Sequence, residues 1–215
     1  IQVGALARHY YKSKYRSFGY HYIETKDKKE ALRQTKDAMQ QDNVFIAEAA
    51  FEWEGCFVRA DILVKRGKTI QLIEVKSSSI NQEEQADVVV ELTPKGEVNK
   101  AYRHYIYDLA FQKYVVENVL GCDVCGYLML INTNKPCDID GLNSMMRINT
   151  KTQEVDVSGL DSYTPSSNEE DWLLLPCDMD MVCDAIIANR TTEQLDYMGA
   201  TFTEYVDMLV GALQN

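Results

Sequence analysis

The chain has 215 residues, with 22 lysines and arginines against 33 aspartates and glutamates, and its formal net charge is −11. A protein this acidic repels phosphate at long range, which excludes a histone-like or coating protein that binds through a basic surface. The 46% of hydrophobic residues supports a packed core, so a mainly disordered chain is excluded as well. Any nucleic-acid role must therefore be local.

The sequence gives no sign of a membrane or targeting segment. The longest apolar run, 124–131, is far shorter than the roughly 18 to 20 residues of a membrane-spanning helix. The start, Ile1-Gln2-Val3-Gly4, lacks a signal-peptide pattern, and its missing initiator methionine is compatible with a fragment of a longer protein. The six cysteines are too few for a disulfide scaffold, so we expect reduced thiols and a cytoplasmic location.

The first part of the chain predicts two helices and then an antiparallel meander of three strands. The first helix, 4–16, is aromatic and basic. Residues 27–41 predict the second helix, whose start Asp27 and Glu30 can cap. The meander has strand-like runs, joined by short turns, at 44–53, 57–64 and 69–76.

The remaining segments predict a mixed sheet with helices around it. Residues 77–97 form an insertion with one short strand near 87–91 and a turn at Thr93-Pro94-Lys95-Gly96. The further expected elements are a helix at 98–120, strands at 124–131, 145–150 and 154–157, a loop at 161–171, and a terminal helix along Leu195, Met198, Phe202, Tyr205, Leu209 and Leu213, with Thr191 and Gln194 as a capping box. The fold class is α/β (α+β), as one domain over 1–215 with a core at about 27–132 and an extension at 133–215.

Three ionisable residues stand on the second and third strands of the meander. Glu74 and Lys76 share a strand face with apolar residues, and Asp61 has the parity of Leu63. Charged groups on a core-facing side cost free energy unless they pair or bind a cation. A hairpin can bring Asp61 beside Glu74, and two such carboxylates suit Mg²⁺ or Mn²⁺. A lysine beside them can orient or help deprotonate an attacking water and stabilise transition-state charge.

The alternative is an ordinary ion pair on a solvated sheet edge, which is what an isolated Glu-x-Lys pattern usually forms. The 98–120 helix favours a site instead. Gln112 falls in the middle of its predicted apolar stripe, and Asp108 borders the stripe. A glutamine there needs either nearby backbone partners or a polar site at the sheet edge. The stripe consists of Val98, Ala101, Tyr105, Leu109, Val116 and Val119.

Asp61, followed by Glu74-Val75-Lys76 and a helix carrying Gln112, resembles the motif of the PD-(D/E)XK nuclease superfamily, particularly its RecB-like branch, which includes CRISPR-associated adaptation exonucleases. The phrases at 46–51, 59–63, 74–78 and 108–112 are also similar to uncharacterised bacterial proteins of that branch. The resemblance covers roughly 44–132 and implies a restriction-endonuclease-like core.

The resemblance implies roles residue by residue. Asp61, Glu74 and the backbone carbonyl of Val75 would ligate Mg²⁺ or Mn²⁺, and Lys76 would be the catalytic lysine. Glu48 would be either a further metal contact or a buried, salt-bridged group. The implied activity is divalent-metal-dependent hydrolysis of DNA, by an exonuclease rather than an endonuclease, with RNA as the other possible substrate. The implied substrate-binding residues are Gln112, Ser77 and Asp108, with Ser78 as a further phosphate donor.

Some positions depart from the family pattern. Ala60 replaces the proline of the motif, and Val116 stands where a tyrosine often follows the helical glutamine. The histidine that such proteins often carry upstream would be His9 or His21. Some relatives hold an iron-sulfur cluster on one cysteine before the core and three after it, but the spacing here does not favour one; the cysteines concerned are Cys56, Cys122, Cys125 and Cys137.

Two further alternatives concern partners and catalysis. The chain could be a catalytically silent binding or assembly module, although Asp61, Glu74 and Lys76 are all retained. The first helix either guides a nucleic-acid strand or packs its tyrosines on the sheet; its residues are Arg8, Lys12, Lys14, Arg16, Tyr11 and Tyr15. The acidic net charge predicts contact through a confined cleft, through further domains of a longer protein, or through a partner with a basic surface, and no contact with a membrane.

Overall fold

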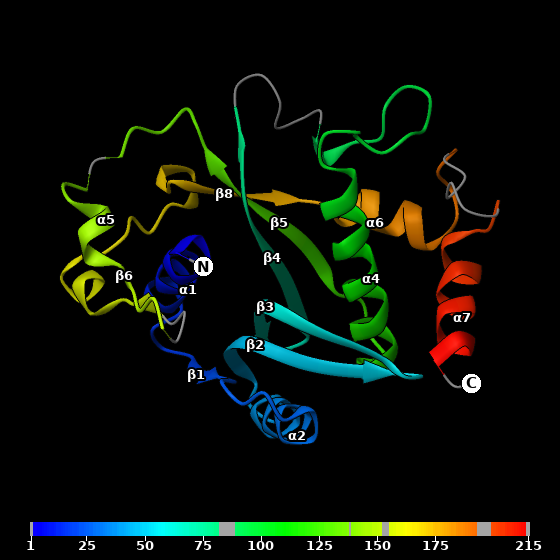
Figure 1. Cartoon of the computed structure of the whole chain (residues 1–215), viewed down its shortest axis with the longest axis horizontal. Helices are drawn as coiled ribbons and strands as arrows, with labels where there is room; N and C mark the ends of the chain where they lie inside the picture. Colours follow the sequence, from blue (N-terminus) through cyan, green and yellow to red (C-terminus); the bar gives the residue numbers. More distant parts are fainter. Residues whose placement is uncertain (1, 82–88, 138, 152–154, 193–198, 214–215) are drawn as a thin grey trace.

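The computed structural model describes residues 2–81, 89–137, 139–151, 155–192 and 199–213. One mixed sheet of six strands lies at its centre, in the order β1-β2-β3-β4-β5-β8 (Figure 1). Its strands are β1 (Gly19–Tyr22), β2 (Asn43–Trp53), β3 (Cys56–Arg66), β4 (Thr69–Ile80), β5 (Cys125–Asn132) and β8 (Leu174–Asp178). The pairs β1–β2 and β4–β5 are parallel, and the other neighbours are antiparallel.

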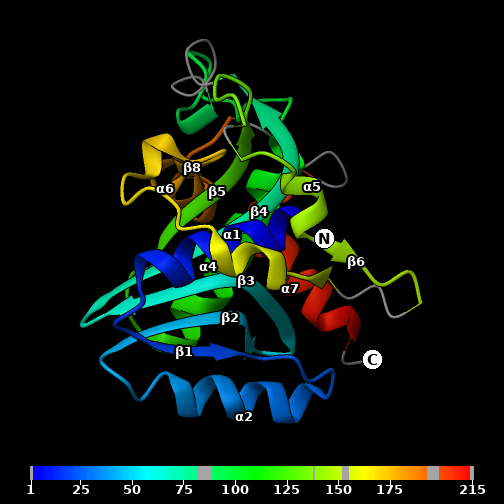
Figure 2. The same cartoon turned by 90° about the vertical axis from the view of Figure 1, so that its left-hand side faces the viewer.

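Helices cover both faces of the sheet, so the molecule has three layers. The helix α1 (Gln2–Lys14) crosses one face, while α2 (Lys28–Ala38) and α4 (Arg103–Leu120) lie on the other (Figure 2). The helices α6 (Asp180–Ile187) and α7 (Phe202–Leu213) pack outside α4. These positions confirm the α/β (α+β) fold class with a mixed sheet between helices.

Each face of the sheet has its own apolar core. On β4, Ile70 and Leu72 point towards α4, and Ile73 points towards α1. This alternation follows from the period of two along a strand. Because both faces are covered, the central strands are apolar almost throughout, as in β2 from Val44 to Phe51. A charged side chain on these strands is therefore placed between the sheet and a helix rather than in solvent.

The predicted meander is confirmed. The turn between β2 and β3 consists of Glu54 and Gly55, which both have positive φ, at 48° and 87°. Two such residues match the type I′ turn that joins twisted antiparallel strands. Asp27 caps α2 as expected, since its side chain accepts a hydrogen bond from the Glu30 N–H at 2.8 Å. The turn at 93–96 is also present, closed by the bond from the Gly96 N–H to the Thr93 carbonyl at 2.7 Å.

The prediction for the longest helix was wrong at its start. α4 begins at Arg103 instead of residue 98, because Asn99 forms a local turn in which its side chain accepts from the Ala101 N–H at 3.0 Å. Ala101 and Val119, which the predicted stripe included, are exposed. The buried side instead includes Ile106, Ala110 and Val115, because α4 is covered both by the sheet and by outer helices.

Several short elements also differ from the prediction. β4 continues to Ile80, into the expected insertion, and Val89 and Val90 are helical rather than part of a strand. The expected strand at 145–150 is reduced to β6 (Arg147–Ile148), which follows a short helix α5 (Leu142–Met145) and pairs with β7 (Val155–Asp156). The 161–171 loop contains one-turn 3₁₀ segments at Ser158–Ser162 and Glu169–Asp171.

The sequence did not predict β1, β8 or α6. β8 forms one edge of the sheet and carries Pro176, which an edge strand tolerates because it needs fewer ladder hydrogen bonds. The terminal helix is confirmed from Phe202 onward, whereas Gln194, Leu195 and Met198 lie outside the described residues. Within the described part of the chain, no helix combines the length and the apolar character needed to cross a bilayer.

Candidate functional site

The sheet opens at the positions where the sequence placed its carboxylates. β3 and β4 pair from Arg66 opposite Thr69 as far as Ile62 opposite Ile73. Beyond that point a side-chain bond replaces the backbone pairing, since the Asp61 Oδ2 accepts the N–H of Val75 at 2.8 Å. The expected proximity of Asp61 to the Glu74-Val75-Lys76 segment is therefore present.

Neighbouring strands are irregular at the same level of the sheet. The β2–β3 ladder skips the pair Glu48 and Asp61, and Glu48 has a φ of 59°. The register is the same on both sides of the missing pair, with Ala47 opposite Ile62 and Ala49 opposite Ala60, so the left-handed Glu48 marks a local break in the ladder without an inserted residue. The register of β4 with β5 also shifts between Val75 and Ser79. The β2–β3, β3–β4 and β4–β5 pairings are thus all interrupted at one level, in the interior of the sheet rather than at its edge.

Side chains from β4 and α4 meet at this opening. Glu74 is 7% exposed, and its two carboxylate oxygens are held separately. Oε1 pairs with Lys76 Nζ at 2.7 Å, and Oε2 accepts from Gln112 Nε2 at 2.9 Å. Lys76 Nζ also contacts Asp108 Oδ2 at 2.7 Å. We call Asp61, Glu74, Lys76, Asp108 and Gln112 the Glu74 cluster.

Two of the three carboxylates of the cluster, Asp61 and Glu74, have too little positive charge nearby to balance them. Burial raises the pKa of Glu74 to about 7, and repulsion from Asp61 adds to the effect despite the contacts with Lys76 and Gln112. Burial likewise raises the pKa of the half-buried Asp61, with repulsion from Glu48 opposing the Val75 N–H bond. Two such neighbouring carboxylates, whose pKa values both rise, form a site that favours either a proton or an added cation.

Lys76 is held in its charged form. Burial by itself lowers the pKa of Lys76, but the bonds to Asp108 and Glu74 outweigh it and raise the pKa above its ordinary value. A lysine with this pKa does not take a proton from water at neutral pH. Of the roles expected for Lys76, the geometry therefore favours orienting a group and stabilising negative charge over deprotonation.

Glu48 is salt-bridged, as one of the two expectations for it stated. Its Oε2 contacts Arg59 Nε at 3.2 Å, and its Oε1 lies 3.9 Å from a guanidinium nitrogen of Arg8. Arg59 is fixed in turn by the carbonyls of Thr25, at 2.9 Å, and Ile23. Glu48 therefore borders the Glu74 cluster and repels Asp61, but its charge is already balanced by two arginines.

The other expected substrate contacts lie at the mouth of the site. Ser77 is exposed, and its hydroxyl has no hydrogen bond to another described residue. Ser78 instead faces α4, where its hydroxyl lies 2.8 Å from that of Tyr105. The Tyr105 ring also lies 5.4 Å from Lys76 Nζ. Tyr105 is thus a member of the site wall that the sequence assigned only to the apolar stripe.

The donor set fits a hard divalent cation. Asp61 and Glu74 offer carboxylate oxygens, and Val75 adjoins the break in the β4–β5 ladder. The buried Oε1 of Gln112 has no hydrogen-bond partner among the described residues, so a donor or a cation bound beside it would stabilise the site. Mg²⁺ typically binds one or two carboxylates and keeps several waters. Within the described residues no group of three His, Cys, Asp or Glu side chains forms a ready-made metal site.

The tyrosines and histidines of the N-terminal segment have structural partners. Tyr11 is 3% exposed and packs on Trp172, with ring centroids 5.5 Å apart, so for this ring the packing alternative was correct. Tyr15 is half-buried and lies 3.4 Å from Gln71 Oε1 through its hydroxyl. His9 contacts the carbonyl of Tyr163 at 2.8 Å, and His21 contacts Gln41 at 2.7 Å. Neither histidine joins the Glu74 cluster.

A second charged group, which the sequence did not predict, lies one residue along α4. Lys113 is 1% exposed, and its Nζ contacts the carboxylates of Glu117, Asp180 and Asp184 at 3.2, 2.5 and 2.9 Å and the Val124 carbonyl at 2.6 Å. We call Lys113 and these three carboxylates the Lys113 cluster. Glu117 at i+4 was a local signal for it, whereas Asp180 and Asp184 are remote in sequence.

No family model, curated protein or solved structure matches the chain. The superfamily expectation thus stays a prediction, and the case for a function depends on the geometry of the Glu74 cluster.

Proposed function

We propose that the protein is a divalent-metal-dependent nuclease that hydrolyses DNA phosphodiester bonds. One observation carries this proposal. The half-buried Asp61 and the buried Glu74, two carboxylates with raised pKa values, lie where the sheet opens, beside Lys76, whose pKa is raised by its carboxylate partners. A cation and a phosphate are the groups that such a surplus of carboxylate oxygen and a neighbouring ammonium together accept.

The residues of the cluster have distinct tasks in this proposal. Asp61, Glu74 and the Val75 carbonyl hold the ion, and Gln112 fixes the orientation of Glu74 through the 2.9 Å bond. When bound, Mg²⁺ or Mn²⁺ would supply Lewis-acid activation of water and charge neutralisation at the phosphate. Lys76 donates to a phosphate oxygen and stabilises the charge that develops on it. Its Asp108 partner is 45% exposed, so the contact at 2.7 Å can exchange for substrate.

We further propose that the substrate is DNA, taken from an end by an exonuclease, and that the protein acts in the cytoplasm. End-dependent action is supported by the resemblance of Asp61, Glu74-Val75-Lys76 and Gln112 to the motif of RecB-like exonucleases. The reducing location is supported by the free thiols of all six cysteines.

The proposal is tested by hydrolysis assays with matched variants. Purified protein is incubated with linear DNA, circular DNA and RNA, in Mg²⁺, Mn²⁺ or EDTA. We expect degradation of linear DNA that requires the ion, is abolished in Asp61→Asn and is slowed by about 10²–10³-fold in Lys76→Ala. Asp161→Asn and Lys68→Ala, two exposed positions outside the cluster, serve as charge-matched controls and keep full activity. Degradation that survives both cluster substitutions, or that ignores EDTA, would refute metal-dependent hydrolysis here.

A binding measurement tests the ion independently of catalysis. Titration of the protein with Mn²⁺ alone should raise the melting temperature, because a ligand that binds only the folded state stabilises it by about 2.7 kcal/mol at 100 times its Kd. The rise should vanish in a double Asp61→Asn, Glu74→Gln variant and persist in Asp161→Asn. An equal rise in all three proteins would place the ion elsewhere.

A further inference from the structure

A positively charged strip lies on the α1 face of the sheet, opposite the face on which Glu74 meets α4. In a chain of net charge −11, residues 2–23 contain four arginines or lysines and no aspartate or glutamate. Lys14 is paired with Glu169 at 2.6 Å, whereas Arg8 and Lys12 lie over exposed tyrosine rings of β1. This is a local exception to the acidic character of the protein.

The strip is regular because helix and strand spacings match. Arg8 lies over Tyr22, 5.0 Å from the ring centroid, and Lys12 lies over Tyr20 at 5.1 Å. Arg8 and Lys12 are four residues apart on α1, a rise of about 6 Å, and the tyrosines are two apart on β1, about 6.6 Å. Two cation–tyrosine pairs therefore stand side by side, and we call Arg8, Lys12, Tyr20 and Tyr22 the α1–β1 strip.

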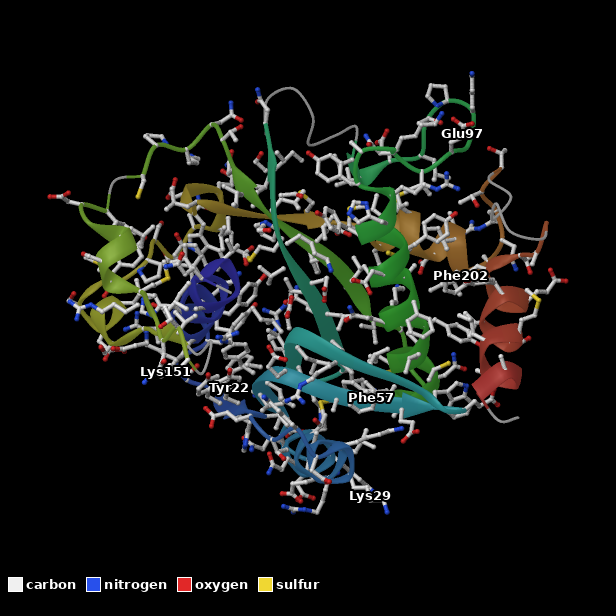
Figure 3. All side chains as sticks on the ribbon, viewed as in Figure 1. Tyr22, Lys29, Phe57, Glu97, Lys151 and Phe202 are labelled. Carbon is white, nitrogen blue, oxygen red and sulfur yellow. The ribbon has the colours of Figure 1, made fainter. Side chains whose placement is uncertain are left out.

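The tyrosines of the strip remain open to solvent. Tyr20 is 39% exposed and Tyr22 is 41% exposed, unlike Tyr10 and Tyr11 on α1, which are buried. Tyr20 is supported from beneath by Phe45, with ring centroids 5.0 Å apart, so its position is fixed by the core. Figure 3 shows Tyr22 at the β1 end of the sheet, well away from Phe202 on α7. Fixed, exposed rings next to cations are the usual platform for unpaired bases.

The strip is linked to the proposed active site through Glu48, where the β2–β3 pairing is broken. Tyr22 pairs in register with Ala47, the residue before Glu48. Arg8, which lies over Tyr22, also reaches Glu48, and Glu48 pairs with Arg59 beside Asp61. A strand lying on Tyr20 and then Tyr22 would thus arrive at the rim of the Glu74 cluster with its phosphates along Lys12 and Arg8.

We propose that the α1–β1 strip binds single-stranded nucleic acid and delivers it to the Glu74 cluster, with one base on each tyrosine after Lys12 and Arg8 have moved from the ring faces onto the phosphates. The delivery step rests on the proposed nuclease function, whereas the binding step does not. A duplex keeps its bases stacked inside the helix and gains nothing from the rings, so the strip selects unpaired strands.

Binding is measured without catalysis, in EDTA and with the Asp61→Asn protein as the common background. The probes are three fluorescently labelled nucleic acids: an oligothymidylate of 20 nucleotides, an oligouridylate of the same length, and a DNA duplex of 20 base pairs. We expect Tyr20→Ala and Tyr22→Ala each to weaken single-strand binding by roughly 5- to 150-fold, and the phenylalanine variants to retain it. Lys12→Gln removes one phosphate contact and should therefore reduce the slope of log affinity against log salt concentration by about 0.7. Lys29→Gln on α2 is the matched cation control and changes neither quantity.

The outcomes separate the two proposals. Wild-type binding in both tyrosine-to-alanine variants, or equal losses for the duplex, overturns the strip whether or not DNA is hydrolysed. Strip-dependent binding without hydrolysis by the wild-type protein in Mg²⁺ or Mn²⁺ overturns the nuclease and leaves the strip. No binding of any probe overturns the strip as well. A preference between the thymidine and uridine strands identifies DNA or RNA as the partner.

Discussion

Two lysines beside α4, Lys76 from the strand β4 and Lys113 from the helix itself, both pair with carboxylates but in different surroundings. Lys76 reaches α4 from β4, and Lys113 projects from α4 towards α6, one residue after Gln112. Both are charged, and burial opposes the charge of each while carboxylate partners outweigh it and raise the pKa. The clusters differ in which sign of charge is buried.

In the Lys113 cluster the cation is buried and the anions are hydrated. Lys113 is 1% exposed, whereas its carboxylate partners are 23% to 48% exposed. One charge is removed from water, and three carboxylates and a carbonyl satisfy it. In the Glu74 cluster the anion is buried, and a second carboxylate, Asp61, raises its pKa further. The first arrangement leaves its unbalanced carboxylates in contact with water, whereas the second buries Glu74, whose charge a divalent cation would balance in the proposed function.

The largest expected effect is on stability at Lys113. Lys113→Ala leaves a cavity in place of a buried side chain and should lower the free energy of unfolding by about 2–5 kcal/mol, whereas the three carboxylates left behind are already partly hydrated. Lys76→Ala should cost clearly less, because Glu74 can take up a proton when its partner is lost. Urea unfolding of both variants at pH 7 measures the difference. Equal losses would mean that the Glu74 cluster is also a structural brace.

The next largest effect is on the hydrolysis rate, where Lys76 is expected to matter more than a lysine with a structural role. Lys76→Ala should lower the hydrolysis rate by about 10²–10³-fold, the range for removing one donor to a developing negative charge. Lys65, on β3, donates to the Met39 carbonyl at 2.7 Å and is a control lysine with a structural bond outside the cluster. Lys65→Ala should therefore change stability more than rate. A rate loss in Lys65→Ala as large as in Lys76→Ala would remove the distinction.

The pH dependence of the unfolding free energy tests whether the pKa of Glu74 is raised in the folded protein. Glu74 has an ordinary pKa of 4.5 and about 7 in the folded state, so the folded protein holds this proton more tightly than the unfolded chain. Its contribution is complete below pH 4.5 and is lost as pH rises through 7, by at most about 3 kcal/mol. Without divalent ions, Glu74→Gln should lose less stability than wild type between pH 5 and 8. Parallel curves for the two proteins would contradict the raised pKa.

The smallest effect concerns the site wall. Tyr105→Phe removes the 2.8 Å contact with Ser78 but keeps the ring beside Lys76. We expect a loss of about 1 kcal/mol in unfolding free energy, typical of one hydrogen bond. The reduction in hydrolysis rate should be less than tenfold. Thermal unfolding and the linear-DNA assay together decide whether the hydroxyl acts on the fold or on the substrate.

The parts of the fold that could be predicted depend on short-range order. The meander follows from alternation and tight turns, and Asp61 meets the Glu74 segment because a single turn joins their strands. Gln112 was found because a polar residue interrupts an apolar stripe. That prediction succeeded even though the stripe was drawn with wrong members, since Glu74 receives the glutamine bond whichever residues flank it.

The parts that could not be predicted depend on distant partners. The pattern of α4 extends to Val98, but the local turn of Asn99 stops the helix. β1 has four residues and exists because it pairs in parallel with β2, across the whole of α2. Lys113 looks like a surface residue until Asp180 is brought to it from α6. The left-handed backbone of Glu48, where the β2–β3 pairing is broken, likewise depends on the packing of two strands, and the residue type gives no sign of it.

The docking of α6 has a consequence for the order of events during synthesis. A ribosome delivers α4 well before Asp180 and Asp184, which lie 67 and 71 residues beyond Lys113. At about 5–20 residues per second, the chain waits several seconds for those counter-charges. During that interval Lys113 has only Glu117 and the Val124 carbonyl as partners, and the side of α4 that α6 later covers is exposed. We therefore expect the contact between Gln112 and Glu74 to gain its full stability only after residue 184 has emerged.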